Sequence, residues 1–263
     1  MAYALWALGY PDQALKRIHE ALTLIQEFSH PFSRAFILNG VTAVHMSRRE
    51  AQATQEWAEK TMALCAEQGF ALILAGGNIL QGWALTEQGQ GEEGIAKIRQ
   101  GLAAWRATGA ETAQPLYLAL LAESYGNTRQ AEEGLNVLAE ALKLVEKTGE
   151  RRFEAELYRL KGELTLQKSS VLSSQLLVPS PQHLASSTQA EAEQCFLKAI
   201  EVAQHQQAKS LELRATVSLA RLWQAQGKQR EAHRMLEEIY NWFTEGFDTK
   251  DLQEAKTLLK ESG

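Results

Sequence analysis

Small residues recur along the chain at intervals of about 40 positions, each at the same place in a repeated apolar pattern. In three of the repeats a bulky apolar residue (Leu5, Leu85 or Trp223) follows three positions later, one helical turn further along the same face. A turn residue comes seven positions after most of the small residues, and a second small residue recurs about five positions beyond the turn. The first small residues are Ala2, Gly40, Gly82, Ala119, Gly162 and Ala220; the turn residues are Gly9, Ser47, Gly89, Gly126 and Gly227; the second small residues are Ala14, Ala51 or Ala53, Gly94, Ala131 and Ala232. A self-similar period of roughly 20–50 residues indicates a repeat architecture.

Each period predicts two antiparallel helices, because strong helix formers dominate and no alternating run is long enough for a strand. Where two helices cross closely, a larger side chain at Gly40, Gly82 or Ala119 would push the axes apart. Glycines at expected helix ends and prolines at expected helix starts mark the boundaries. The predicted helices span 1–8, 12–28, 32–46, 48–68, 71–88, 92–108, 111–125, 128–148, 151–167, 188–206, 208–226, 229–243 and 249–261.

The pattern predicts an all-α fold, a right-handed superhelix of about six antiparallel helix pairs that forms a single domain over residues 1–263. The step from Gly162 to Ala220 is 58 residues, and the excess falls in the serine-rich segment 168–188, which we expect to be a mobile inserted loop. The first helix, MAYALWAL, is short and apolar, unlike a polar terminal cap. We expect a missing helix or a second copy of the chain to cover it.

Composition narrows the choice of partners. The formal net charge is -5, with Arg and Lys interleaved with Glu, whereas nucleic-acid-binding proteins usually carry a basic patch. Cys65 and Cys195 lie on helical stretches among apolar residues, which favours buried thiols and a reducing cytoplasm. The most apolar stretch, 70–85, is shorter than the roughly 20 residues of a membrane span. We therefore expect a cytoplasmic protein that binds neither nucleic acid nor membrane.

The repeated pattern resembles the tetratricopeptide repeat (TPR), and steps near 40 resemble the longer, degenerate variety of bacterial signal-transduction ATPases. The resemblance covers nearly the whole chain and rests chiefly on Glu87–Glu111, Glu146–Leu166 and Ser210–Leu259. These stretches are similar to the C-terminal region of large bacterial proteins in which an adenylate/guanylate cyclase or protein kinase domain precedes a predicted ATPase. The resemblance implies a regulatory module whose parent's catalytic motifs lie upstream of this segment.

The chain carries no recognisable catalytic or cofactor motif. Residues 89–94, GQGEEG, match G-x-G-x-x-G, but the preceding segment reads as helix rather than strand, and Glu92 and Glu93 would repel phosphate. No P-loop, H-E-x-x-H, paired C-x-x-C or G-x-S-x-G motif occurs, and the six histidines are scattered. We expect no catalytic residues, no cofactor and no metal site.

The concave face of the superhelix is the expected binding surface, because the first helix of each pair lines it. Tryptophan and arginine are enriched at binding hot spots. The alternative is that Trp83 belongs to the core and that the charged residues pair with one another at i, i+3 or i, i+4. A carboxylate clamp would need Lys and Asn along the groove, which the face does not supply, so a co-chaperone role is disfavoured. The candidate groove residues are Arg34, Trp83, Thr86, Glu123, Glu156, Arg159, Glu163, Arg214 and Arg221.

Three hypotheses for function follow. The first is a non-catalytic scaffold that binds a partner protein, a peptide or the neighbouring ATPase or cyclase domain of a parent chain, with a homodimer through the N-terminal unit as a further option. The second is a fragment of a cyclase or ATPase whose catalytic domains are absent from this segment. The third is a small-molecule-sensing repeat domain of the transcription-activator type, with any DNA-binding part elsewhere.

Overall fold

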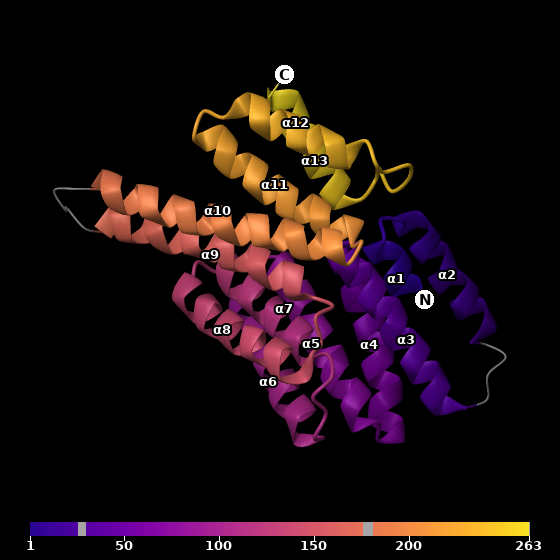
Figure 1. Ribbon diagram of the computed structural model, residues 1–263. Helices are drawn as coiled ribbons and strands as arrows, with labels where there is room; N and C mark the ends of the chain where they lie inside the picture. Colours follow the sequence, from indigo (N-terminus) through magenta and orange to yellow (C-terminus); the bar gives the residue numbers. More distant parts are fainter. Residues whose placement is uncertain (26–29, 176–180, 263) are drawn as a thin grey trace.

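The computed structural model describes residues 1–25, 30–175 and 181–262, and in these residues the chain forms helices joined by turns, without strands (Figure 1). The all-α prediction is confirmed, and most helix ends lie within three residues of the predicted ones. The helices are α1 (Ala2–Ala7), α2 (Pro11–Leu24), α3 (Pro31–Ser47), α4 (Ala51–Gln68), α5 (Ala71–Glu87), α6 (Gly91–Ala107), α7 (Gln114–Asn127), α8 (Ala131–Thr148), α9 (Glu154–Gln175), α10 (Pro181–His205), α11 (Lys209–Ala225), α12 (Gln229–Tyr240) and α13 (Lys250–Ser262). The predicted helix residues 26–28 lie outside the described ranges.

The helices form two layers. The odd-numbered helices contact one another in sequence from α1 to α13 and make the inner layer, while each even-numbered helix packs outside, between two of them. Helix α1 also contacts α11, so the inner layer closes on itself. This closure brings side chains from the turn of the second pair, from α7 and α9, and from α11 and α13 to one place.

Glycines permit the close helix crossings at some of the predicted positions. A Cβ atom added at Gly82 would lie 2.7 Å from the carbonyl oxygen of Gly94, and one at Gly162 would lie 2.5 Å from the ring of Phe196. The glycines of the G-x-G-x-x-G match therefore serve a turn and a helix contact. The expectation for Gly40 is wrong, because nothing lies within 4 Å of its added Cβ.

In every pair whose turn lies within the described residues, that turn contains a residue with a positive φ angle. Gly9 and Gly89 take this conformation as predicted, with φ of 94° and 86°. In the second and fourth pairs, however, the left-handed residues are Arg49 and Arg129, both with φ of 61°. The predicted turn residues of these pairs, Ser47 and Gly126, still lie within α3 and α7, because those helices continue further than expected.

The segment 168–188 differs from the expected loop. Helix α9 continues to Gln175 and α10 begins at Pro181, so the extra residues lengthen a helix pair; the five between them lie outside the described ranges. The two helices run side by side beyond the ends of their neighbours (Figure 1). Each helix therefore packs against the other. Within α9, the Ser170 hydroxyl donates a hydrogen bond to the Gln167 carbonyl at 2.7 Å. The mobility of this segment stays a prediction.

The chain itself covers the apolar first helix. Trp6 is 3% exposed and packs in a cluster with Ala208 and Leu211, and the Ser210 hydroxyl donates to the Trp6 carbonyl at 2.6 Å. The Arg214 guanidinium lies over the Trp6 ring, 5.0 Å from its centroid. The cover that we expected from a missing helix or a second copy is therefore supplied by the same chain.

A second set of contacts joins α2 to the segment between α12 and α13. The Glu245 carboxylate accepts hydrogen bonds from the backbone N–H groups of Asp12 and Gln13, both at 3.0 Å. In return, the Gly246 N–H donates to the Asp12 carboxylate at 2.9 Å. We call these four residues the clasp, because they fasten the first helix pair to the last.

Candidate functional site

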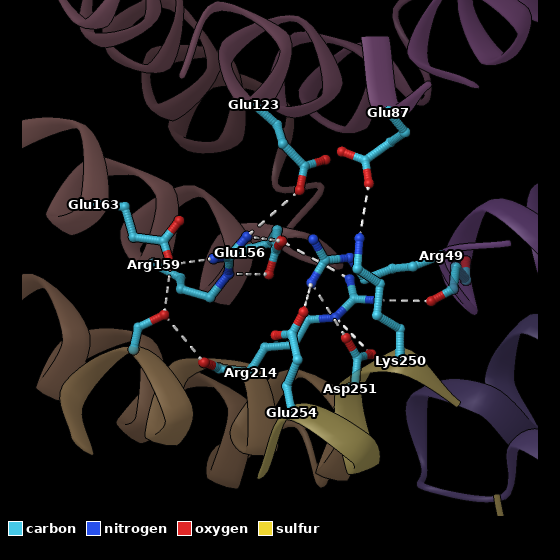
Figure 2. Close-up of polar contacts among 12 residues, drawn as sticks. Arg49, Glu87, Glu123, Glu156, Arg159, Glu163, Arg214, Lys250, Asp251 and Glu254 are labelled. Atoms are coloured by element: carbon cyan, nitrogen blue, oxygen red, sulfur yellow. Dashed lines mark hydrogen bonds and ion pairs between the residues drawn. The ribbon is translucent and has the colours of Figure 1, made fainter. Parts of the chain in front are cut away.

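A pocket of about 220 Å³ lies where the inner helices meet. We call it the central pocket. Its walls come from α7, α9, α11, α13 and the turn between α3 and α4, and Leu160, Leu164 and Val217 supply an apolar part. The charged residues that line it are four arginines and four acids: Arg49, Arg159, Arg214, Arg221, Glu123, Glu163, Asp251 and Glu254. Figure 2 shows acidic side chains from opposite walls converging on the arginines between them.

Helix α9 provides the most tightly bonded part of this cluster. Its charged residues follow one another at helical spacing, so they share one face. The Arg159 guanidinium donates to both oxygens of Glu156, at 2.6 and 3.0 Å, and contacts the Glu163 carboxylate at 2.7 Å (Figure 2). The Ser218 hydroxyl of α11 also donates to Glu163 at 2.7 Å. The charges on α9 thus pair at i, i+3 and i, i+4, as the alternative interpretation predicted.

Helix α13 closes the opposite wall with two acidic residues. Arg214 donates to the Asp251 carboxylate at 2.8 Å and to the Ser47 carbonyl at 2.7 Å, so it joins α3, α11 and α13. Glu254 lies between two other arginines, 3.6 Å from Arg49 and 3.4 Å from Arg221. These two contacts are longer than a charge-assisted hydrogen bond of roughly 2.7–2.9 Å.

The surroundings shift the pKa values of two buried acids of this cluster in opposite directions. Burial alone would raise the pKa of Glu156, but the nearby Arg159, with Arg214 and Arg49, outweighs it and lowers the pKa to about 2. Glu123 has no arginine within hydrogen-bonding distance, since Arg159 is 3.9 Å away, and burial raises its pKa. The cluster therefore holds a firmly ionised carboxylate beneath the pocket, at Glu156, and a carboxyl group in the pocket wall, Glu123, whose pKa lies above its ordinary value.

Trp83 and Thr86 lie in the core beside the pocket. Trp83 is 1% exposed, and its indole N–H donates to Glu123 at 2.8 Å. The Thr86 hydroxyl donates to the Trp83 carbonyl at 2.7 Å and lies 3.1 Å from the Ser124 hydroxyl. Trp83 thus holds Glu123 in place rather than offering its ring to a partner.

The structure brings together most of the predicted groove residues. Glu123, Arg159, Glu163, Arg214 and Arg221 line the central pocket, and Glu156 lies beneath it, bonded to Arg159. Arg34 does not join them, because its position on α3 is exposed and outside the pocket lining.

Sequence reasoning missed Arg49, Asp251 and Glu254. Arg49 holds the turn position midway between Gly9 and Gly89, at a spacing of 40 from each, and that regular step was the signal available. The acids on α13 lie three positions apart on one helical face, but no pattern in the sequence shows that α13 folds over the groove.

Three polar atoms of the pocket residues lack a hydrogen-bond partner although they are buried. They are the Arg49 Nε, the Gln167 Oε1 and the Asp251 Oδ1. A buried donor or acceptor without a partner costs about 1–3 kcal/mol. Water or a polar ligand in the pocket would recover this energy.

Other kinds of site find no support in the described part of the chain. No group of three or more His, Cys, Asp or Glu side chains there is arranged to hold a metal ion. No helix within those residues has the length and apolar character to cross a bilayer. The two described cysteines are buried, unpaired thiols, as predicted, and burial raises their pKa.

No family model matches the chain. A protein of Rhizobium meliloti (strain 1021) described as uncharacterized is 26% identical over 165 residues, which are 62% of this chain and 16% of that protein. This chain therefore matches only a small part of that protein's length.

Two solved structures have a similar fold. NprR in complex with its cognate peptide NprX aligns with a TM-score of 0.62 and 14% identity over 96% of this chain and 65% of NprR. A variant of the TPR-like repeats of a putative kinesin light chain from Podosopora anserina aligns with a TM-score of 0.51 and 18% identity, over 81% of this chain and 95% of that one. This chain is a TPR-like helical solenoid. At these identities the likeness extends to the fold alone.

Proposed function

We propose that the central pocket binds an extended peptide segment of a partner protein or of a neighbouring domain, and that the chain is a non-catalytic interaction scaffold. The observation that carries this proposal is the cluster of eight charged residues around a pocket that also holds partnerless polar atoms. Peptides present charged side chains, chain termini and backbone amides. These groups can pair both with the arginine donors and with the carboxylate acceptors of the pocket. The peptide in the similarly folded NprR complex supports this choice of ligand.

The size of the pocket limits what enters it. A volume of about 220 Å³ corresponds to about seven water molecules at roughly 30 Å³ each. An α-helix with its side chains is about 10 Å or more across, which is too wide for such a space. A few side chains or a chain end of an extended segment fit the pocket, and a folded partner would rest on its outer edge.

The context of this scaffold is also a proposal. The resemblance to bacterial cyclase- and kinase-linked ATPases suggests a C-terminal regulatory module in the cytoplasm, without turnover of its own. A homodimer through the N-terminal unit would have to use exposed residues such as Leu8 and Leu24, because Trp6 is covered. The hypothesis of a larger parent protein is tested with an antibody against residues 210–259, which detects the native product in cells. A product much larger than 29.3 kDa supports the hypothesis, and a product of 29.3 kDa contradicts it.

The binding site is tested with peptides selected from a random phage-displayed library on the purified protein. Arg221 is the suitable position for charge reversal, because its side chain is 51% exposed and its loss leaves the buried ion pairs intact. We expect Arg221→Glu to weaken binding of the selected peptides at least about tenfold. Arg234→Glu, a matched reversal at an exposed position of α12, should not. Equal binding by both variants, or a library that yields no binder, contradicts the proposal.

A further inference from the structure

We infer that the pocket takes the carboxylate of an acidic peptide segment between Arg49 and Arg221, and that Glu254 of α13 holds this position as a built-in competitor. The inference rests on the proposed peptide site and names the chemistry that the site selects. Three features support it. The ion pairs of Glu254 are long, the two arginines stay positively charged when Glu254 leaves, and α13 remains anchored by its buried residues.

The contacts of Glu254 are longer than the close ion pairs of the same pocket. Its two oxygens lie 3.6 Å from Arg49 and 3.4 Å from Arg221. The pairs Arg159–Glu163 and Arg214–Asp251 are 2.7 and 2.8 Å long. The Arg49 Nε has no hydrogen-bond partner, and the other acid that forms an ion pair with Arg49, Asp251, is also 3.6 Å away. A free carboxylate that is not tethered to α13 can approach both guanidinium groups more closely and satisfy the Nε.

The charge balance of the pocket favours an anion once Glu254 is displaced. Arg159 keeps Glu156 and Glu163, at 2.6 and 2.7 Å. Arg214 keeps Asp251 at 2.8 Å. Arg221, by contrast, loses the ion pair with Glu254, and Arg49 keeps Asp251 at 3.6 Å. The part of the pocket between Arg49 and Arg221 is therefore locally cationic once Glu254 leaves, which explains why an acid of the chain itself occupies it.

Displacement of Glu254 needs only a side-chain rotation. Helix α13 is anchored by Leu252, Ala255 and Leu258, which are buried in a cluster with α11 and α12 residues. Asp251 stays bonded to Arg214 at 2.8 Å, so the helix remains in place. The Glu254 side chain is 28% exposed and can turn toward solvent. If Glu254 holds the position about nine-tenths of the time, the apparent affinity for a competing carboxylate is lowered about tenfold.

The test uses a fluorescein-labelled six-residue peptide with two glutamates and its glutamine counterpart, measured by fluorescence anisotropy on the full chain. We expect Glu254→Gln to bind the acidic peptide about tenfold more tightly than the wild type. Arg49→Gly should bind it at least about tenfold more weakly, and glycine fits the left-handed turn at this position without strain. The matched control is Arg129→Gly, at the equivalent exposed turn of the fourth pair, which should bind like the wild type.

The inference is overturned if Glu254→Gln binds no more tightly, if Arg49→Gly binds as well as Arg129→Gly, or if the glutamine peptide binds as tightly as the acidic one. Thermal melting by circular dichroism of each variant excludes misfolding as the cause. The phage-selected peptides separate the two proposals. Suppose that the selected peptides bind less tightly to Arg221→Glu, carry no acidic residue and bind equally well to Glu254→Gln and the wild type. The proposed peptide site is then supported, and the proposed role of Glu254 as a competitor is refuted.

Discussion

Replacement of Glu156 by glutamine tests whether the arginine cluster is a source of stability as well as a binding surface. Glu156 is the acid beneath the pocket whose pKa falls from 4.5 to about 2 because Arg159, Arg214 and Arg49 outweigh its burial. A shift of one pKa unit corresponds to about 1.4 kcal/mol, so the ionised carboxylate contributes about 3 kcal/mol to folding at neutral pH. Loss of one partner from a buried ion pair costs a similar amount, about 3–5 kcal/mol.

The direction of the pH dependence follows from the lowered pKa. The folded state holds the ionised form, so the stabilisation is present above the unfolded pKa of 4.5 and declines as the pH falls toward 2. We therefore expect Glu156→Gln to be about 3 kcal/mol less stable than the wild type at pH 7. By pH 3 about 2 kcal/mol of that difference should have disappeared.

Urea denaturation followed by circular dichroism at pH 7, 5, 4 and 3 measures both quantities. The control is Glu140→Gln, which removes the same charge from the Glu140–Arg106 pair, where both side chains are about half exposed. An exposed pair contributes at most about 1 kcal/mol, so this variant should stay close to the wild type at every pH. The reasoning is refuted if Glu156→Gln lies within 1 kcal/mol of the wild type at pH 7, or if the difference does not shrink with acid.

Three further changes test the packing, the buried tryptophan and the closure. Gly82→Ala should lower the free energy of unfolding by about 1–3 kcal/mol through overpacking against α6, whereas Gly40→Ala should raise it by up to about 1 kcal/mol through helix propensity; equal effects in urea denaturation would contradict the structure. Trp83→Phe removes the indole donor to Glu123 and should cost about 1–3 kcal/mol in the same assay, and an unchanged midpoint would show that this hydrogen bond contributes little. Glu245→Ala removes the acceptor of two N–H groups at the start of α2 and should cost about 1 kcal/mol, with faster amide hydrogen exchange confined to α2 as the check; unchanged exchange would refute a role for the clasp.

The helix pairs could be predicted because their determinants are local. Helix-forming residues, a turn every 40 positions and glycine at helix ends set each pair, and Gly82 was read correctly because its apolar neighbours repeat along one face. The turn of the second pair was misplaced because Arg49 occupies the left-handed position usually given to glycine. Segment 168–188 was read as a loop because its serines are weak helix formers, but α9 and α10 support each other along their length.

The candidate site could be predicted only in part, because it depends on how far the superhelix turns. A helical projection correctly placed Arg159 and Glu163 on the inner face, since both lie on one helix. The projection could not show that α13 would reach the α3–α4 turn. The position of α13 depends on the small rotation between successive helix pairs, and these rotations add up along the chain. Arg34 was included on the same projection but lies on the exposed part of α3, away from that meeting point. Contacts between distant pairs have no periodic signature in the sequence.

The meeting of α13 with the α3–α4 turn makes the pocket dependent on closure. Arg49 comes from near the start of the chain and Glu254 from near its end, and they share a wall because the start and the end of the chain are held together. The clasp and the contacts of Trp6 with α11 both contribute to this closure. A ligand that contacts both Arg49 and the α13 wall would bind more tightly when the start and the end of the chain are in contact than when they are apart. By linkage, the free energy that this closure adds to ligand binding equals the free energy that ligand binding adds to closure. The clasp acids lie on the surface, whereas the pocket charges are largely paired. A change at the clasp would therefore alter the affinity of such a ligand without altering the pocket itself.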